Sequence, residues 1–270
     1  MKIAFIGAGN MASAMIGGLI DRGLPQTDIL AIDPNDAARV RCAEQFGIEA
    51  SSAIDTQLRD YDAIVLAVKP QILKNACIEL APMLRAQLVV SIAAGIRIWD
   101  LSRWMGGYSR IVRAMPNTPA LIGKGIAGVF AANGVDDGGR MIASRVLEAV
   151  GTTVWLDDEA QLDAVTAVSG SGPAYVFYFL EAMQAAAVEL GLSNEQGSAL
   201  AIATFSGATA LVSHSDVSIG TLRDRVTSKG GTTASALASF AMDDIKAAII
   251  RGAMAAKIRA RELGDEFGAM

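Results

Sequence analysis

Two glycine-rich stretches of this 270-residue chain combine residue types that bind anions. One of them, VTSKGGTT at residues 226–233, places two glycines and four hydroxyl side chains directly before a segment expected to be helical. Glycines let backbone N–H groups turn toward one point, and a helix N-terminus favours negative charge by roughly 0.3–1 kcal/mol. The residues predicted to hold the anion are Ser228, Gly230, Gly231, Thr232 and Thr233. A turn that only caps the helix is the alternative interpretation.

The other stretch, GAGNMA at residues 7–12, has the G-x-G-x-x-A spacing of a dinucleotide-binding turn. It follows the apolar run KIAFI and opens a helical pattern, which is the context that the motif requires. Gly7 permits a tight turn, Gly9 lets the backbone approach a pyrophosphate, and Ala12 allows close packing of helix on strand. The predicted contacts of the pyrophosphate are Gly7, Ala8, Gly9, Asn10 and Met11. A glycine-rich turn without a ligand is the alternative.

Asp33 ends the next apolar run, DILAI, and bears on the choice of dinucleotide. A carboxylate at this place usually accepts hydrogen bonds from the ribose of NAD and repels the 2′-phosphate of NADP. Asn35 and Arg39 follow closely, and the Arg39 guanidinium could pair with that phosphate. Asp33 could instead cap the next helix. The sequence therefore predicts Asp33 and Asn35 as cofactor contacts and leaves NADPH and NADH open.

Three later strand ends are expected to complete the cofactor site, because ligands bind at the carboxyl ends of strands in open α/β sheets. Small residues and prolines at these ends suit a flat ring that lies close to the backbone, although ordinary loop structure is the alternative at each of them. The predicted contacts are Ala67, Val68, Lys69, Pro70, Ala93, Gly95, Met115, Pro116 and Asn117.

Short apolar runs alternate with helical patterns in the first half of the chain, which predicts a parallel sheet covered on both faces. Helices are expected over residues 10–21 and 36–46, and the expected strands are KIAFI, DILAI, DAIVLAV, QLVVSI, RIVRAM, IAGVF and TTVWL. No strand pattern follows residue 164. The predicted fold is an α/β, Rossmann-like domain with a mostly parallel sheet at residues 1–160, then an all-α dimerisation domain at residues 161–270.

Local signals place the later helices. One helix should have Pro173 in its first turn and stop at Gly191, and Ser193 with Gln196 could form a capping box for the next. A last helix should open at Asp243 and Asp244 and end at Gly264.

The segment at residues 196–215 lacks Asp, Glu, Lys and Arg, yet its scattered polar residues and modest hydrophobicity argue against a membrane span. We expect it to be buried inside protein. Helices that are apolar on nearly every face cannot stay single in water, so an interlocked homodimer is expected. Packing of these helices on the sheet domain of the same chain is the alternative.

The overall composition excludes several classes of partner. The net charge is −5 and no basic stripe is visible, which argues against nucleic acid. The apolar run at the N-terminus is too short for a signal peptide, and a strand is the better interpretation. The two cysteines, Cys42 and Cys77, form no metal or disulfide pattern. We therefore expect no bound metal. This cysteine usage also fits a reducing compartment, so we expect a cytoplasmic protein.

The scarcity of histidine narrows the chemistry. Many hydroxy-acid dehydrogenases use a histidine as general acid–base, but the single histidine, His214, is expected at a helix end. A cyclic imine removes this need, because its nitrogen can take a proton from water and the iminium then accepts hydride. Such an enzyme must mainly orient the reactants and exclude water.

The motifs FIGAGNM, LAVKP, VVSIAAG, IVRAMPNTPA, AVSGSGPAYVFYFLEAM and VTSKGGTTASALASF resemble the pyrroline-5-carboxylate reductase family nearly from end to end. The resemblance implies NAD(P)H-dependent reduction of 1-pyrroline-5-carboxylate to L-proline, the last step of proline biosynthesis. It also implies a Rossmann domain followed by a helical domain that dimerises by intertwining, with further assembly into rings in many members.

The resemblance also implies roles for site residues. Backbone N–H groups around Gly230–Thr233 would hold the substrate carboxylate, and Thr233 would touch the ring nitrogen as the catalytic residue. Asp216 would stabilise the iminium, unless it lies in a solvated loop. Lys229 stands where the family usually has proline, and we expect it to point outward or to steer the carboxylate without acting as the acid.

Two other functions fit part of the pattern. A β-hydroxyacid dehydrogenase has a similar plan, but it needs a catalytic lysine that the segment SGSGPAYVFYFLEAM lacks. A non-catalytic dimer that senses NADPH would not need the second anion-binding turn.

Overall fold

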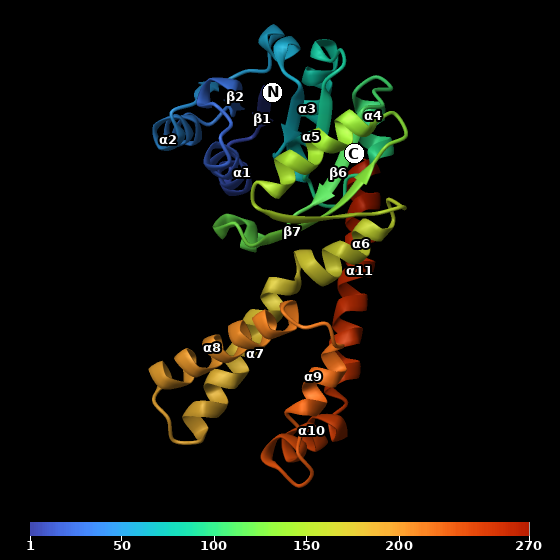
Figure 1. Ribbon diagram of the computed structural model, residues 1–270. Coiled ribbons are helices and arrows are strands. Elements are labelled where there is room, and N and C mark those ends of the chain that lie inside the picture. The colour runs from blue at the N-terminus through green and yellow to red at the C-terminus, as the bar shows by residue number, and fades with distance from the viewer. Residues whose placement is uncertain (270) are drawn as a thin grey trace. The chain divides into compact units, whose positions relative to one another are not determined.

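The computed structural model describes residues 1–269, and the chain divides into two compact units (Figure 1). The sheet unit contains residues 1–171 and the residues from 256 onward, and the helical unit contains residues 172–255.

The sheet unit is built on eight strands in the order β3-β2-β1-β4-β5-β6-β7-β8. All neighbouring strands are parallel except β6 and β7, which confirms the predicted Rossmann-like, mostly parallel sheet. The seven predicted strands are present, and the short edge strand β3 was not predicted. The strands are β1 Ile3–Ile6, β2 Ile29–Ile32, β3 Glu49–Ser51, β4 Ala63–Leu66, β5 Leu88–Ser91, β6 Ile111–Met115, β7 Gly125–Ala131 and β8 Gly151–Trp155.

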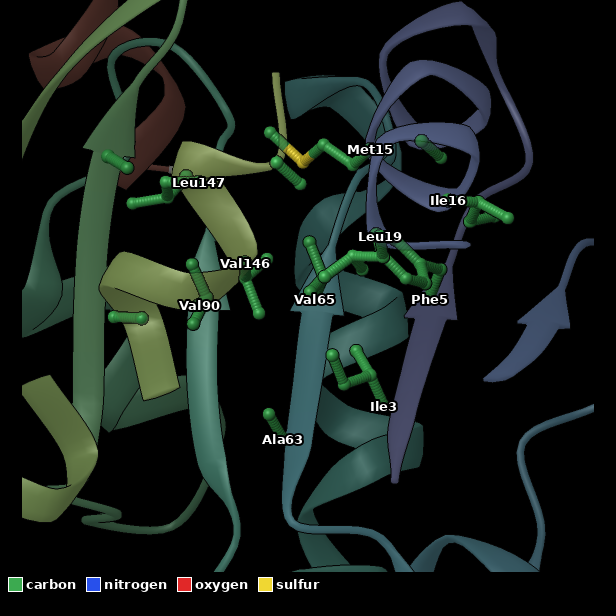
Figure 2. Packing of buried hydrophobic residues seen from close by; sticks show 14 of the residues in the cluster. Ile3, Phe5, Met15, Ile16, Leu19, Ala63, Val65, Val90, Val146 and Leu147 are labelled. Carbon is green, nitrogen blue, oxygen red and sulfur yellow. The ribbon is translucent and has the colours of Figure 1, made fainter. Parts of the chain in front are cut away.

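The central strands are buried on both faces because helices cover both sides of the sheet. Successive side chains of β1 point to opposite faces, so Ile3 and Phe5 join one apolar cluster while Ala4 and Ile6 join the other. Figure 2 shows the first cluster, in which Met15, Ile16 and Leu19 of one helix lie against these strand residues. This burial holds the strand ends, and the turns that follow them, in fixed positions.

Two helices of the sheet unit were predicted from the sequence, and both are present. The bounds of α1 and α2 match the predicted ranges, and the α2 N-terminus is capped by Asn35, whose side chain accepts a hydrogen bond from the N–H of Ala38. The helices are α1 Asn10–Asp21, α2 Asp36–Phe46, α3 Pro70–Leu80, α4 Ile98–Trp104, α5 Asp137–Glu148 and α6 Gln161–Val165. The shorter turns are η1 Gln26–Asp28, η2 Thr56–Asp60, η3 Ala81–Met83, η4 Thr118–Ile122 and the π-helical η5 Thr166–Gly170.

The helical unit contains no strand among its residues. Its first helix has Pro173 in the first turn, as predicted, and the chain turns at Gly191, whose φ is +93°. The predicted capping box is confirmed, because Ser193 Oγ accepts from the N–H of Gln196 while Gln196 Oε1 accepts from the N–H of Ser193. The helices are α7 Gly172–Glu189, α8 Asn194–Ser213, α9 Ile219–Arg225, α10 Thr232–Met242 and the first part of α11 Ile245–Ala269, whose residues from 256 onward belong to the sheet unit.

The expected burial of α8 is not found within a single chain. Leu200, Ile202 and Leu211 expose 56%, 55% and 58% of their surface. These side chains are therefore not covered by the other helices of the helical unit. None of the helices over residues 1–269 is long and apolar enough to cross a membrane.

The predicted end of the last helix at Gly264 is wrong, since α11 continues to Ala269. Gly264 has a packing role instead. A Cβ at this position would lie 2.8 Å from the carbonyl oxygen of Gly95, so only glycine lets the helix approach the loop after β5. An ion pair joins the same two segments next to this contact. Arg97 Nη2 and Asp265 Oδ1 are 2.7 Å apart, and each residue lies within two positions of one of the glycines.

Candidate active site

The turn between β1 and α1 has the geometry of a phosphate-binding turn. Gly7 has a φ of +103°, and a Cβ there would lie 2.7 Å from the carbonyl oxygen of Ala67 on the neighbouring strand end. Gly9 is the N-cap of α1, and no side chain of the described chain caps this helix. Because Gly9 and Asn10 are exposed, the N–H groups of the first turn of α1 are accessible to a bound anion.

Asp33 joins this turn to the next one. Its Oδ2 accepts from the N–H of Ala8 and its Oδ1 accepts from the N–H of Asn35, both at 2.9 Å. The alternative that Asp33 caps α2 is wrong, because Asn35 caps that helix. Both carboxylate oxygens thus brace the backbone around the predicted ribose position.

Two guanidinium groups lie at the same end of the sheet. Arg39 donates from Nη1 to the carbonyl oxygen of Asp33 at 2.7 Å and pairs with Asp36. Arg41 donates from Nη2 to the carbonyl oxygen of Ala8 at 3.2 Å, and its position was not predicted. The signal in the sequence was a second arginine two residues after Arg39. The two guanidinium groups thus lie next to Asp33 and the β1–α1 turn, with Arg39 already paired with Asp36.

The loops after β4 and β5 lie at the carboxyl ends of neighbouring strands, as predicted for Ala67–Pro70 and for Ala93 and Gly95. Pro70 is the first residue of α3, and Lys69 at its N-cap makes no side-chain capping bond, so a second helix N-terminus opens at this edge. Gly95 has a φ of +80° and packs on Gly264, so its glycine is required by the fold whether or not it contacts a ligand.

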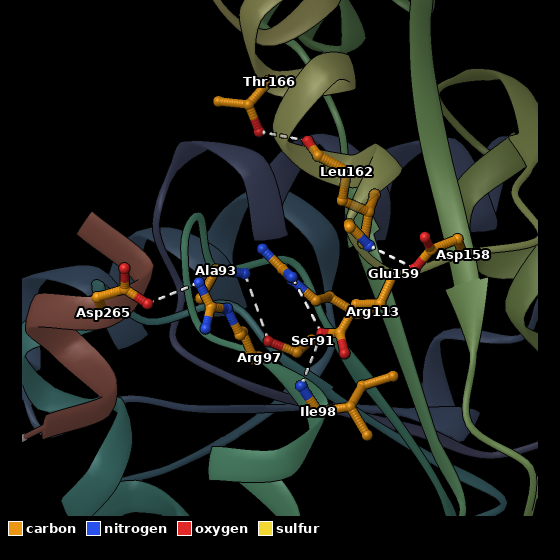
Figure 3. A network of polar contacts seen from close by, with 11 residues as sticks. Ser91, Ala93, Arg97, Ile98, Arg113, Asp158, Glu159, Leu162, Thr166 and Asp265 are labelled. Carbon is orange, nitrogen blue, oxygen red and sulfur yellow. Dashed lines mark hydrogen bonds and ion pairs between the residues drawn. The ribbon is translucent and has the colours of Figure 1, made fainter. Parts of the chain in front are cut away.

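A buried ion pair that sequence reasoning missed supports these loops (Figure 3). Arg113 on β6 is only 4% exposed, and its Nη1 donates to Glu159 Oε1 at 3.0 Å. The same Glu159 oxygen accepts from the N–H of Ile98, the first residue of α4, at 2.8 Å. Ser91 Oγ accepts from the N–H of Ala93 at 3.4 Å. The available signal was a charge inside the apolar run RIVRAM.

Asn117 follows the end of β6, but its side chain is engaged inside the fold. Its Oδ1 accepts from the N–H of Ile126 at 3.0 Å, and its Nδ2 donates to Ser169 Oγ at 3.2 Å. Met115 is half-buried and Pro116 is buried.

In the helical unit, the predicted anion-binding residues lie in a single turn. Gly230 has a φ of +74°, and the N–H of Gly231 donates to the carbonyl oxygen of Ser228 at 3.0 Å. Gly231 is the N-cap of α10 and no side-chain bond caps it, while Thr232 and Thr233 are the first two residues of the helix. The turn therefore presents an accessible helix N-terminus with hydroxyl groups on both sides.

The remaining predicted residues lie outside this turn or point away from it. Asp216 is exposed between α8 and α9, and it has no hydrogen bond or ion pair with any residue of the described chain. Lys229 is exposed, in line with its predicted outward orientation. His214 is the C-cap of α8 with Nδ1 2.8 Å from the carbonyl oxygen of Ala210, which agrees with a helix-end role.

Comparison with known proteins places this geometry in a family. Residues 159–263 match the family described as "Pyrroline-5-carboxylate reductase dimerisation", and residues 2–95 match "NADP oxidoreductase coenzyme F420-dependent". The pyrroline-5-carboxylate reductase of Pseudomonas aeruginosa is 46% identical over 99% of this chain and 98% of its own. A solved structure of a pyrroline-5-carboxylate reductase from Coxiella burnetii has a TM-score of 0.92, with 37% identity over 97% of this chain and 98% of that one.

A further solved structure carries a cofactor. The pyrroline carboxylate reductase of Plasmodium falciparum with NADP bound has a TM-score of 0.86, with 29% identity over 98% of both chains. The likeness in sequence and fold runs through both units, and the chain belongs to the pyrroline-5-carboxylate reductase family, a family of oxidoreductases.

Proposed function

We propose that the protein reduces 1-pyrroline-5-carboxylate to L-proline, the last step of proline biosynthesis, with NADPH as the hydride donor. NADPH would supply a hydride to the imine carbon, and the imine nitrogen would carry a proton taken from solvent. The observation that carries the proposal is the uncapped glycine turn at the start of α10, in a chain whose relatives along its whole length are pyrroline-5-carboxylate reductases. An acidic imine needs such an anion site in addition to the dinucleotide turn.

On the cofactor side, the N-terminus of α1 would hold the pyrophosphate through residues 7–11. Asp33 and Asn35 would lie at the adenosine ribose, and Arg39 and Arg41 favour a 2′-phosphate over a free hydroxyl there. NADPH is therefore the proposed cofactor, and NADH is the alternative. The nicotinamide half would lie along the loops that contain Ala67, Val68, Lys69, Pro70, Ala93, Gly95, Met115, Pro116 and Asn117.

On the substrate side, the backbone N–H groups of Gly230–Thr233 and the Ser228 hydroxyl would hold the carboxylate. Thr233 would touch the ring nitrogen, and Asp216 would stabilise the iminium charge from a distance. In this proposal, residues 1–160 would form the dinucleotide-binding domain, and residues 161–270 would bind the substrate and the partner chain.

The same proposal covers assembly and compartment. The match of residues 159–263 to a dimerisation family, together with the exposed apolar side chains of α8, supports a homodimer formed through the helices. Further assembly into a ring is the extension of this proposal. Cys42 and Cys77 are both free, which supports a reducing compartment such as the cytoplasm.

The test is to mix the protein with NADPH and pyrroline-5-carboxylate and to follow the loss of nicotinamide absorbance, with a parallel reaction in NADH. Turnover with proline as product, and a higher kcat/KM for NADPH, is the expected result. Oxidation of a 3-hydroxy acid without imine reduction would indicate a β-hydroxyacid dehydrogenase. NADPH binding without any turnover would indicate a sensor and would overturn the proposal.

A further inference from the structure

The carboxyl end of β6 is held by a side chain where the strand itself stops. The register pairs Val112 with Ala131 and Met115 with Gly128, and pairing then ends. Continued for two more residues, that register would place Asn117 opposite Ile126. The backbone leaves the sheet before this point, and Asn117 Oδ1 accepts the hydrogen bond from the N–H of Ile126 at 3.0 Å. The side chain thus extends the ladder past the end of β6.

The other end of the same amide reaches a different segment. Asn117 Nδ2 donates to Ser169 Oγ at 3.2 Å. Since Ile126 contributes an N–H, Oδ1 must face it, and this fixes the orientation of the amide. Ser169 lies in η5, a π-helical turn closed by the N–H of Ser171 donating to the carbonyl oxygen of Thr166 at 2.8 Å. Single π-helical turns are frequent at functional sites.

Two close contacts pack the end of α6 and η5 against β6 and β7. A Cβ at Gly170 would lie 2.7 Å from Met115 Cε, and a Cβ at Gly128 would lie 2.6 Å from Val165 Cγ2. A larger residue at Gly128 would push against the branched Val165 side chain, whereas one at Gly170 would require only the flexible end of Met115 to shift. The chain continues from Ser171 directly into Gly172, where the helical unit begins. Asn117 is therefore bonded both to Ile126 of β7 and to Ser169, in the last turn before that unit.

We propose that Asn117 is a positioning residue for hydride transfer and that it acts through its bond to Ser169. Its amide is committed to Ile126 and Ser169, so it shapes the Met115–Pro116 strand end instead of contacting the nicotinamide. This inference rests on the proposed reductase function. Because hydride transfer is sensitive to misplacement on the scale of 1 Å, loss of the bond lowers the rate of the chemical step more than it weakens cofactor binding.

The experiment uses the full-length Ser169→Ala, Asn117→Ala and double variants. Single-turnover hydride transfer, the isotope effect with NADPH deuterated at the transferred position, and NADPH affinity by fluorescence are measured for each. We expect hydride transfer to slow about fivefold in Ser169→Ala and about tenfold or more in Asn117→Ala, with NADPH Kd changed less than about threefold. The double variant should be no slower than Asn117→Ala within about twofold, because both changes remove one interaction.

Ser144→Ala is the matched control. Ser144 Oγ accepts from Trp155 Nε1 at 3.2 Å, the same acceptor type and distance as Ser169, and both serines are half-buried. Its hydride-transfer rate should equal that of the unchanged protein. The inference is overturned if Ser169→Ala has the same rate as Ser144→Ala, or if the two single effects multiply in the double variant. Absence of imine reduction by the unchanged protein would instead overturn the proposed function, and the inference with it.

Discussion

Arg113 is the charged residue that most affects the shape of the candidate site. It lies in a buried strand, and its guanidinium is balanced by Glu159, whose carboxylate also bonds the first N–H of α4. Replacing both residues by apolar ones of similar volume would change the free energy of unfolding little. The attraction between the two charges is largely offset by the cost of removing both from water. Removing only one partner is costly, because it leaves the other charge without compensation.

We predict that Arg113→Met lowers the free energy of unfolding by about 2–3 kcal/mol, below the range for fully buried pairs because Glu159 is 24% exposed. The double variant Arg113→Met with Glu159→Gln should recover about half or more of this loss. Urea unfolding at one fixed protein concentration measures both. A double variant as unstable as the sum of the two single variants would contradict the pairing.

Thr233 is the residue through which the proposed chemistry is tested most directly. Thr233→Val keeps the size and the backbone N–H but removes the hydroxyl, so we expect kcat/KM for the imine to fall about 10–100-fold. Thr233→Ser should recover most of the activity. Steady-state kinetics at fixed NADPH provide the measurement, and equal losses in both variants would show that the hydroxyl is not used.

Lys229→Ala is the companion change in the same turn. We expect kcat to stay within about threefold, because Lys229 is exposed and its ammonium would steer the carboxylate without transferring a proton. KM should rise mainly at low ionic strength. A variant that binds substrate normally but loses nearly all hydride transfer would make Lys229 the acid and overturn its assigned role.

Burial raises the pKa of the Cys77 thiol from 9.0 to about 12, and burial also raises the pKa of Cys42. The folded-state pKa of Cys77 lies above its unfolded value. The contribution of this thiol to the free energy of unfolding is therefore fully present below pH 9.0 and is lost as the pH rises toward 12. We predict a steep alkaline loss of stability, which Cys77→Ala should make shallower. Unfolding midpoints measured across that pH range test this, and identical slopes would contradict it.

At the scale of elements, the contact between the loop after β5 and α11 depends on two glycines. Gly264→Ala would place a methyl group 2.8 Å from the carbonyl oxygen of Gly95, against backbone that cannot easily move. We expect it to lower the free energy of unfolding by about 1–3 kcal/mol and to weaken NADPH binding, since Gly95 lies at the predicted nicotinamide edge.

Gly138→Ala is the control for this change. Gly138 is in the first turn of α5, and its added methyl group would meet only Asp136 Oδ1 at 3.6 Å, an ordinary contact. A small gain of up to about 1 kcal/mol is expected, because alanine loses less backbone entropy in a helix. The same stability for both variants would show that the close approach of α11 is not required.

At the scale of the whole molecule, the helical unit exposes more large apolar side chains than one chain can leave in water. Phe177 and Tyr178 of α7 and Ile202 of α8 expose 61%, 71% and 55% of their surfaces. Exposed large apolar side chains in such numbers on one unit are typical of a protein interface. Membership of a family with a dimerisation domain gives the same expectation.

We predict that Ile202→Asp shifts the protein from an oligomer toward monomer, because it places a charge in a desolvated interface. Met141→Asp is the matched control, since Met141 is 71% exposed on α5 of the sheet unit. Molar mass from size-exclusion chromatography with light scattering provides the measurement. An unchanged mass for Ile202→Asp would exclude this face of α8 from the interface.

Local patterns were enough to predict much of this protein. The seven strands, α1, α2 and the capping box of α8 were correct because side-chain periodicity, glycine turns and caps act over a few residues. The two glycine turns that open α1 and α10 could be predicted for the same reason, since each depends on consecutive residues, and the binding of an anion by either turn stays a prediction.

Contacts between residues far apart in the chain could not be predicted in this way. Gly264 has the pattern of a helix end. Its lack of a side chain is instead required by the close contact with Gly95, which is more than half the chain away in sequence. Arg113 finds Glu159, and Asn117 finds Ser169, only once β6 and the segment after β8 are folded side by side. A residue's type shows what it can bond, but the partner it meets depends on which strands and helices the fold brings together.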